Sequence, residues 1–502
     1  MPDALTRPPR GLLLALALAL VVRAVAFPLS LNHYGDAPVR AEIAERWAAS
    51  PHVIRGFNEV YQFGPVHIYA LGVAMRLVPD RDLASRGLSF LLGLLGIAAL
   101  YALARRLEGD DAATLAACAL ALHGLHVQAS VSAASEAVFL ALLCASLERF
   151  FATLDSATPR AQLANAALAG ALFSLAEGVR YDAWMQAPIA AAILLFHWRR
   201  GRVTLAAAAT FGVLAAAFPL AWLASNAASA GSALAPLKHI DADHLALAGA
   251  SIARMGRPLY ALFCLQYWPS MLALTATPIV AGLAVAGAVD AFRKREHVEL
   301  VLLAWLPPAY MTLRGAVLQD FRPLARFTLT TAALTVPFAW RGLQLIAPRA
   351  RRAVLAAGAA LAVAMPVSLA LASAGRNGSL AEWARPISPL STVPPGIAEA
   401  AGWLREHHTE RDVLLVDGVW DYLDIPLVFY AGFPEDRVIR RAWTNFEAKL
   451  AVQRPTLVVA IYQGDLASTP GVSLEGDVAV VRGRGYHLVA KFVYATIYRA
   501  DE

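Results

Sequence analysis

The chain has 502 residues, of which 58% are hydrophobic and only 16% are charged. Soluble domains have about 45–50% apolar and about 25% charged residues, so this composition excludes a protein that is soluble throughout. The formal net charge is +6. A modest basic excess in a membrane protein reflects Lys and Arg kept in cytoplasmic loops, so we expect no nucleic-acid partner. The three cysteines lie in apolar runs without CxxC spacing, which predicts small core residues and neither a disulfide framework nor a zinc site.

Apolar segments long enough to cross a bilayer recur along the first 373 residues. A spanning helix needs about 20 mostly apolar residues. In the first such segment, Ala24-Val25-Ala26 resembles a signal-peptide cleavage site, but Arg23 and the many later spans favour an uncleaved anchor. The sequence predicts about eleven transmembrane helices, at 11–30, 87–104, 112–130, 136–153, 161–178, 182–198, 203–224, 268–291, 298–313, 326–346 and 353–373.

The stretch 63–79 is ambiguous by length, and the arginine distribution decides how it is interpreted. If it does not span, five basic loops fall on the side of the N-terminus, and if it spans, all five move to the other side. The positive-inside rule favours the first arrangement, with a cytoplasmic N-terminus and 63–79 lying on or dipping into the outer face. The basic loops lie at 105–106, 149–160, 199–202, 293–295 and 349–352; the predicted outer segments are 31–86, 123–135, 177–182, 225–267, 314–326 and the tail from about 374.

The tail changes character. Residues 374–394 are rich in turn formers and are interpreted as a linker. In 395–502, GIAEAAGWLREHH predicts an amphipathic helix, 412–417 and 455–462 predict buried strands, and 487–499 alternates like one half-exposed strand. The predicted fold is therefore an all-α polytopic membrane protein over 1–373 with a small α/β domain over 395–502 on the outer side.

Asp36 is the first candidate for chemistry. It follows Gly35 directly after the first apolar segment, and Ala37-Pro38 should open a helix behind it. One interpretation is that Asp36 caps this helix. The other is a general base, because a carboxylate in a partly dehydrated cleft can take a proton from an attacking hydroxyl. The two roles are compatible.

Further charged residues gather at predicted outer helix ends. Glu136 stands where an outer loop re-enters the membrane, and Arg180 and Asp182 crowd a tight outer turn with Glu177. Arg322 and Arg326 follow Arg314 in a short outer segment, against the charge rule, and could grip a phosphate. Each group has a structural alternative. Glu136 could simply interact favourably with its helix dipole, the acids and Arg180 of the tight turn could form structural ion pairs, and the late arginines could contact lipid headgroups. Arg40, Tyr61 and His67 of segment 31–86 complete the predicted substrate-binding set.

No metal site is assigned from the sequence. The His123 and His126 pair has no adjacent acid, and no HExxH pattern occurs. The run KHIDADH at 238–244 contains a DxD-like triplet, which leaves a divalent cation open, although a solvated loop is the simpler interpretation.

The acid after the first span, the Pro- and Tyr-containing juxtamembrane helix and the run RGLSFLLGLLGIAALYALARRLEGDDAATLAACALAL resemble the GT-C superfamily of membrane glycosyltransferases. The protein mannosyltransferase and aminoarabinose transferase group is the most similar, over about residues 10–200 and, more loosely, ARFTLTTAALTVPF. The resemblance implies transfer of a hexosyl or pentosyl group from a polyprenyl-phosphate donor to a lipid, glycan or protein hydroxyl on the outer face. It also implies a bacterial inner or plasma membrane, with the 395–502 domain in the periplasm. It implies Asp36 as the base, Glu136 as the acid of the second outer loop and Arg326 as a donor-phosphate contact.

Two departures from that pattern bear on the substrate. Protein mannosyltransferases have Asp-Glu where this chain has Asp36-Ala37, and this difference weakens the case for a protein acceptor. Phe63-Gly64-Pro65 replaces a basic residue before a Pro pair, so Arg322 or Arg326 must supply that phosphate contact. A transporter or flippase of lipid-linked sugars, which would carry mid-span charges and inverted repeats, and a non-catalytic subunit of an envelope assembly complex stay open as alternatives.

Overall fold

The computed structural model describes residues 9–375, 378–394, 396–418, 423–441, 445–462 and 464–501. These residues form two compact units. The helical unit contains the chain up to Ser30 and Ile43–Ser391, and the mixed unit contains Leu31–Glu42 and Thr392–Glu502. Helix α2 (Ala37–Ala49) contributes residues to both.

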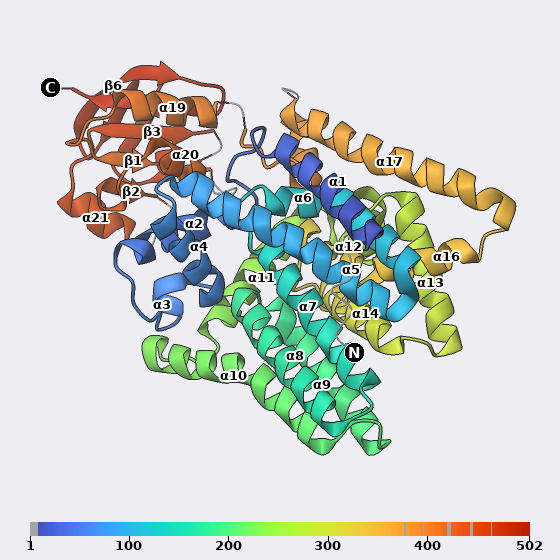
Figure 1. Ribbon diagram of the computed structural model, residues 1–502. Coiled ribbons are helices and arrows are strands. Elements are labelled where there is room, and N and C mark those ends of the chain that lie inside the picture. The colour runs from blue at the N-terminus through green and yellow to red at the C-terminus, as the bar shows by residue number, and fades with distance from the viewer. Residues whose placement is uncertain are drawn as a thin grey trace. The chain divides into compact units, whose positions relative to one another are not determined.

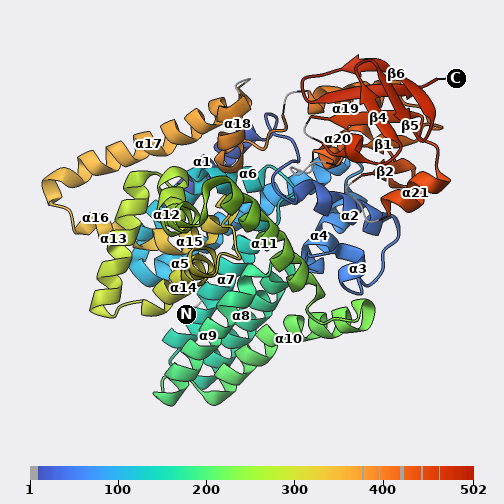
Figure 2. The same cartoon turned by 180° about the vertical axis from the view of Figure 1, so that it is seen from behind.

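The helical unit is a bundle of helices whose lengths vary widely (Figure 1). Helices α7, α8 and α10 pack against one another, as both views show (Figure 2). The helices are α1 (Arg10–Ala26), α3 (Phe57–Val60), α4 (Pro65–Leu77), α5 (Arg81–Leu122), α6 (Gly124–Ser130), α7 (Ser135–Asp155), α8 (Pro159–Val179), α9 (Asp182–Arg199), α10 (Leu205–Ala230), α11 (Ala235–Met255), α12 (Arg257–Thr275), α13 (Pro278–Lys294), α14 (Val298–Leu313), α15 (Thr328–Thr335), α16 (Ala339–Gln344), α17 (Pro348–Ala374) and α18 (Gly378–Ala384).

Fewer helices can cross a membrane than the sequence predicts. Within the described residues, five are long and apolar enough, or six if the bent pair α12 and α13 counts as one span. Eleven spans are therefore not confirmed. The predicted span 268–291 is wrong as a straight helix, because α12 and α13 meet at 120°. The predicted span 326–346 is divided among α15, α16 and short 3-10 turns.

One prediction about helix ends agrees with the structure and another is corrected. The predicted spans 87–104 and 112–130 lie in α5 and α6, and the non-helical break of α5 at Gly109, where φ is +86°, falls in the predicted gap between them. The predicted outer loop 225–267 is mostly helical, because α11 and the start of α12 lie within it. Its alanine- and leucine-rich sequence favours a helix without being apolar enough to appear as a span.

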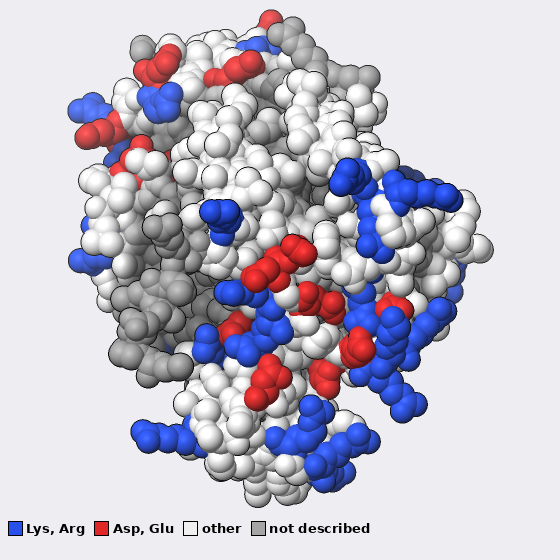
Figure 3. Space-filling model, turned by 45° about the vertical axis from the view of Figure 1, so that its right-hand side comes forward, with Lys and Arg blue, Asp and Glu red and all other residues white. Residues whose placement is uncertain are grey.

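The arginine-rich loops contact one another at one end of the bundle. Arg106 Nη2 lies 2.6 Å from Glu148 Oε1, and Gln162 Nε2 donates to Arg202 O at 2.9 Å. His197 Nε2 lies 2.8 Å from Glu299 Oε1. Figure 3 shows basic and acidic side chains mingled on part of one face, while broad areas carry no charge. Which side of the membrane these loops face stays a prediction.

Helix α4 covers the ambiguous stretch 63–79, and its surroundings argue against a crossing. It has 13 residues, about 20 Å at 1.5 Å per residue, against a hydrocarbon core of about 30 Å. Gly64, before its start, lies against Gly178. Beyond its end, Arg86 Nε donates to Val131 O at 2.8 Å. The start of α4 thus contacts the turn at 177–182, which the sequence places on the outer side, and whether 63–79 spans the membrane stays a prediction.

Within the described residues, the mixed unit contains one seven-stranded sheet of order β2-β1-β3-β7-β6-β5-β4. Strands β1 and β3 pair in parallel, with Leu414 opposite Leu457, and β3 and β7 are antiparallel, with Leu457 opposite Arg499. The predicted amphipathic helix is confirmed as α19, and the predicted strands at 412–417 and 455–462 are confirmed as β1 and β3. The elements are β1 (Leu414–Val416), β2 (Val438–Arg440), β3 (Leu457–Ile461), β4 (Val472–Glu475), β5 (Val478–Val481), β6 (Arg484–Lys491), β7 (Ala495–Ala500), α19 (Ile397–His407), α20 (Asp424–Ala431) and α21 (Phe446–Val452).

Both faces of the central strands are buried. Leu414 and Val416 pack with α19 and α20, while Leu415, between them, packs with α21 on the other face. This is the alternation that a strand covered on both faces gives. The predicted single strand 487–499 is wrong, because the chain reverses after Lys491 and returns as β7. The alternating pattern continues through the reversal, so periodicity alone could not reveal it.

Asp417, at the end of β1, should make the stability of the mixed unit depend on pH. Its carboxylate accepts from the amides of Leu466 at 2.8 Å and Ile461 at 3.2 Å, yet burial raises its pKa from 3.8 to about 6. Between these values the native state holds a proton that the unfolded state has released. Stability should therefore fall as pH rises from about 4 through 6, by about 3 kcal/mol at most.

The measurement is the pH slope of the apparent unfolding temperature in detergent, compared with that of Asp417→Asn. The variant cannot ionise, so the component that falls with rising pH should vanish. Identical slopes in the two proteins would contradict the assignment, whatever their absolute stabilities.

Candidate functional site

Arg180 is the centre of a buried ion-pair cluster in the helical unit. Its Nη1 lies 2.6 Å from Glu136 Oε1 and donates to Ser135 Oγ at 3.1 Å. Its Nε lies 2.7 Å from Asp182 Oδ2. The side chains of Arg180 and Glu136 are only 7% and 6% exposed. The ends of α7, α8 and α9 therefore bring three of the predicted site residues together.

The cluster carries one guanidinium against two carboxylates, so its formal charge is −1. Because Arg180 is already paired with acids, this cluster is better suited to accept hydrogen bonds from hydroxyl groups than to bind a phosphate. Glu177, buried one turn earlier on α8, makes no ion pair with Arg180 among the described residues. Arg180 and Asp182 of this turn thus form the ion pair of the structural interpretation, without Glu177, and a role in substrate binding stays a prediction.

Aromatic side chains stand beside this turn. Trp222 Nε1 donates to Tyr181 Oη at 2.8 Å, and the Tyr181 and Trp184 rings meet edge to face at 5.1 Å between centroids. Phe218 stacks on Trp222. Apolar rings around a few fixed polar groups are the usual lining of a small-molecule site. Tyr181, Trp184 and Trp222 are not among the predicted site residues.

The Phe63-Gly64-Pro65 run packs on the same turn. A Cβ on Gly64 would lie 2.1 Å from Gly178 O, so two backbones touch where only glycine fits. Pro65 then begins α4, as proline at a first helical turn should. The departure from the family pattern at this motif is therefore a close contact that fixes α4 against the end of α8.

Gly64→Ala should destabilise the protein through this contact alone, because the backbone there, with φ of −75°, accepts alanine. We expect a loss of about 1–3 kcal/mol from overpacking, seen as a lower unfolding temperature in detergent. Gly87→Ala in α5 is the matched control, since its added methyl meets nothing within 4 Å. Equal stability of the two variants would refute the close contact.

The segment after α14 holds the late arginines. It continues as a π-helix (Arg314–Leu318) and then runs extended to a 3-10 turn at Ala325–Phe327. His244 of α11 stacks on Phe321 with centroids 4.2 Å apart, and its Nδ1 donates to Arg322 O at 3.1 Å. Tyr260 Oη donates to Phe321 O at 2.7 Å. Side chains from α11 and α12 thus fix the backbone beside Arg322.

The arginines of this segment differ in their partners. Arg314 is paired with Asp320 at 3.1 Å and with Asp241 at 2.8 Å. Arg322, half-buried, makes no ion pair with an acid among the described residues. Arg326 is half-buried, and its guanidinium lies 5.7 Å from the Phe327 ring centroid. Arg314 is thus committed to two acids, and a phosphate-binding role for Arg322 or Arg326 stays a prediction.

An apolar cluster joins this segment to the Arg180 turn. Met185, three residues after Asp182 on α9, packs in the same cluster as Phe321, Phe327 and Trp268. The arginine segment and the Glu136–Arg180–Asp182 cluster are therefore neighbouring parts of one region of the helical unit.

Asp36 and Arg40 belong to the mixed unit. Gly35 has a φ of +52°, a conformation that glycine adopts readily, and α2 begins directly after Asp36 with Pro38 in its first turn. Arg40 Nη2 lies 3.9 Å from Asp36 Oδ2, and the two side chains are 5% and 17% exposed. The predicted helix start is confirmed, and the catalytic role stays a prediction.

The remaining predicted ligands lie in the helical unit. His67 is fully buried in α4. Tyr61 is a third exposed, with a φ of +53° that is uncommon for a non-glycine residue. A role for either in substrate binding stays a prediction.

The predicted DxD-like loop is wrong as a loop. Residues 238–244 lie within α11, and Asp241 pairs with Arg314. Among the described residues, no group of three or more His, Cys, Asp or Glu side chains could hold a metal ion.

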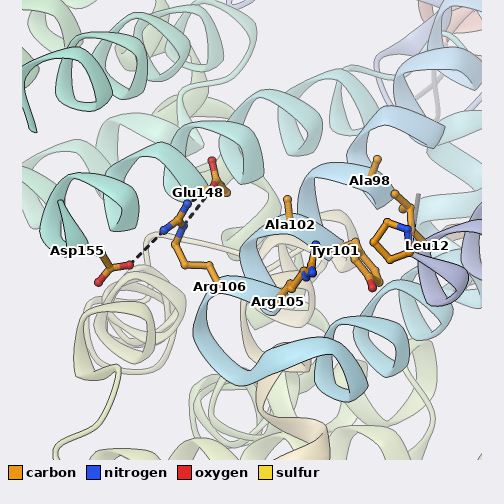
Figure 4. A pocket seen from close by; sticks show the side chains of 9 residues that line it. Leu12, Ala98, Tyr101, Ala102, Arg105, Arg106, Glu148 and Asp155 are labelled. Atoms are coloured by element: carbon orange, nitrogen blue, oxygen red, sulfur yellow. Dashed lines mark hydrogen bonds and ion pairs between the residues drawn. The ribbon is translucent and has the colours of Figure 1, made fainter. Parts of the chain in front are cut away.

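An open pocket lies at the other end of α7 (Figure 4). Its volume is about 490 Å³, and its charged lining is Arg105, Arg106, Glu148 and Asp155. Arg106 is held between the two acids, at 2.6 and 3.2 Å. Glu148 is twelve residues from Glu136 on one helix, about 18 Å by helical rise, so this pocket is separate from the Arg180 cluster.

Part of the chain matches a known protein family. Residues 62–223 match the family model described as dolichyl-phosphate-mannose-protein mannosyltransferase. The match includes Glu136, Arg180 and Asp182. Comparison with curated protein sequences gave no match.

The structural likeness extends over nearly the whole chain. ArnT from Cupriavidus metallidurans bound to undecaprenyl phosphate has 14% identity and a TM-score of 0.68, and 97% of each chain is covered. The oligosaccharyltransferase of Archaeoglobus fulgidus, in a complex with Zn and sulfate, has 16% identity and a TM-score of 0.56 over 90% of this chain and 68% of its own. The chain has the GT-C fold.

A third similar structure contains bound ligands. The archaeal oligosaccharyltransferase AglB from Archaeoglobus fulgidus, in complex with an inhibitory peptide and a dolichol-phosphate, has a TM-score of 0.54 at 14% identity over 90% of this chain and 69% of its own. The resemblance to this superfamily that the sequence predicts is confirmed. The membrane class is supported by the apolar helices of this chain.

Sequence reasoning missed two residues, Arg440 and Tyr430, that hold the Asp36 segment. Arg440 pairs with Glu42, and Tyr430 Oη accepts from the backbone amide of Asn32. Arg440 and Glu42 are 398 residues apart. The only signal in the sequence is that both are charged residues beside apolar runs.

Proposed function

We propose that this chain is a membrane glycosyltransferase that moves a sugar from a polyprenyl-phosphate-linked donor to an acceptor hydroxyl on the outer face. The observation that carries the proposal is the fold shared over 97% of both chains with ArnT, whose structure contains undecaprenyl phosphate. The mannosyltransferase family match over 62–223 supports the same reaction class. The sugar is a hexose or pentose, and the acceptor is a lipid, a glycan or a protein.

In this proposal Asp36 is the general base of an inverting transfer. Its carboxylate takes the proton of the acceptor hydroxyl while that oxygen forms a bond to the anomeric carbon. The bond between the anomeric carbon and the phosphate oxygen breaks, and the lipid phosphate leaves with the electron pair. Asp36 at the start of α2, partly shielded from water, has the residue type and setting for this role.

Arg322 and Arg326 hold the phosphate in this proposal. A guanidinium donates two parallel hydrogen bonds to phosphate oxygens and stabilises the charge that builds on the leaving group. Arg322 is favoured because it makes no ion pair with an acid among the described residues, whereas Arg314 has two acidic partners. The Glu136–Arg180–Asp182 cluster lies in the same region and offers carboxylate oxygens to sugar or acceptor hydroxyls.

The deciding experiment is a donor panel. Purified protein in liposomes is incubated with radiolabelled polyprenyl-phosphate sugars and mixed lipid, glycan and peptide acceptors, and products are identified by mass spectrometry. The proposal predicts labelled acceptor together with free polyprenyl phosphate. Donor that changes leaflet without losing its sugar would instead support a flippase, and neither event with any donor would support a non-catalytic subunit.

A further inference from the structure

Segment 31–42, which carries Asp36, is part of the mixed unit and not of the helical bundle that follows it in sequence. Leu31 packs against the apolar core formed by α19, α20 and the sheet. The backbone amide of Asn32 donates to Tyr430 Oη at 2.5 Å. Glu42, at the other end of the segment, pairs with Arg440. Asp36 therefore lies between two anchors, four residues after one and six before the other.

Arg440 is the stronger anchor. It ends β2, is 1% exposed and also contacts Asp424 Oδ2 at 3.2 Å and Glu435 Oε2 at 3.3 Å. Burial disfavours its charged form, but Glu42, Asp424 and Glu435 outweigh this and keep the pKa of Arg440 above its ordinary value. Lys449 Nζ lies 4.0 Å from Glu435 Oε1. Two cations thus face three acids, so each acid depends on the shared guanidinium.

The anchors act on different atoms of the segment. Tyr430 holds the backbone before Asp36, whereas Arg440 holds a side chain on α2, five residues after the helix begins. Fixing both ends leaves Asp36 little freedom to change its position. Catalytic groups need this restraint, because a displacement of about 1 Å can cost about 100-fold in rate.

We propose that Arg440 and Tyr430 are positioning residues that hold Asp36 for proton abstraction, so that the C-terminal domain controls the catalytic competence of the N-terminal segment. This inference rests on the proposed function. Neither residue touches substrate in it, and both act through the geometry of residues 32–42.

The test compares two isosteric variants of acids that share one guanidinium. Glu42→Gln loosens the Asp36 segment from Arg440, while Glu435→Gln removes a contact to the same guanidinium without touching the segment. Hydrogen–deuterium exchange of the full chain in detergent should be about tenfold faster over residues 31–42 in Glu42→Gln. It should be unchanged there in Glu435→Gln. Tyr430→Phe should speed exchange of the Asn32 amide.

The second readout is kinetic. Glu42→Gln and Tyr430→Phe should lower kcat about tenfold or more with the KM for the donor lipid within about twofold, because the donor site is not altered. Glu435→Gln should keep both constants within about twofold. Equal exchange over 31–42 in wild type and Glu42→Gln would overturn the proposal, and so would an unchanged kcat in Glu42→Gln.

The two hypotheses fail in different ways. Exchange needs no substrate, so a wild-type protein that transfers no sugar would refute the proposed function while the exchange pattern still reports on the anchors. An active wild type with unchanged exchange in Glu42→Gln would keep the proposed function and overturn the positioning role.

Discussion

Asp36→Asn should abolish sugar transfer while the protein stays folded and inserted. A general base contributes about 10²–10⁴-fold, and an amide cannot accept the acceptor proton. Asn has nearly the same volume as Asp, and Gly35 and Pro38 still set the start of α2. We expect kcat to fall by about 10³-fold, measured as radiolabel transfer to acceptor by the liposome-reconstituted variant, with donor binding retained.

Asp80→Asn is the matched control. Asp80 caps α5, where its side chain accepts from the Leu83 amide at 2.9 Å, and Asn is an equally good cap. This variant makes the same chemical change on the same predicted side of the membrane and should keep kcat within about twofold. An Asp36→Asn protein that transfers sugar at the wild-type rate would remove Asp36 from the mechanism.

Arg180→Met should cause the largest loss of stability. It removes the guanidinium that Glu136 and Asp182 share and leaves the buried carboxylate of Glu136 and the partly buried carboxylate of Asp182 without this counter-charge. Breaking a buried ion pair on one side costs about 3–5 kcal/mol. We expect a clearly lower unfolding temperature and, because the Glu136 carboxylate is displaced, about 100-fold slower transfer.

Two further variants separate these effects. Arg106→Met also removes a guanidinium from between two acids, Glu148 and Asp155, but at the far end of α7 and at a more exposed position. It should lose less stability and keep kcat. Adding Glu136→Gln to Arg180→Met should recover part of the stability, because a neutral amide needs no counter-charge. If Arg106→Met impaired transfer as strongly as Arg180→Met, the cluster would have no specific role in catalysis.

Local signals in the sequence predicted much of the secondary structure. Apolar periodicity located α19, β1 and β3, and Pro38 marked the start of α2. Loop charge predicted which loops group together, because the cost of moving Arg and Lys across a bilayer is a property of composition. The family resemblance followed from the same N-terminal third.

The number of spans could not be predicted in the same way. A hydropathy window counts apolar residues and does not register where a helix bends, as between α12 and α13. The alanine-rich α11 shows the reverse error, since it is helical without being a candidate span. Tertiary packing decides these cases.

The sequence predicted individual residues of the site but not how they are arranged. Glu136, Arg180 and Asp182 were each selected as charges at outer helix ends, but their shared ion pair depends on the packing of α7 against α8. The distinction between Arg314 and Arg322 depends on Asp241, which lies 73 residues before Arg314. Contacts at such separations leave no periodic trace in one sequence.

The grouping of residues 31–42 with the C-terminal domain has a practical consequence for dissecting this protein. A truncation after Ser391 would delete Arg440, Tyr430 and the apolar core on which Leu31 packs, and would leave Leu31 exposed. Conversely, residues 392–502 expressed alone would bury Arg440 with one acid fewer. If the protein is produced as two fragments, residues 392–502 should therefore restore its function only when the other fragment contains residues 31–42.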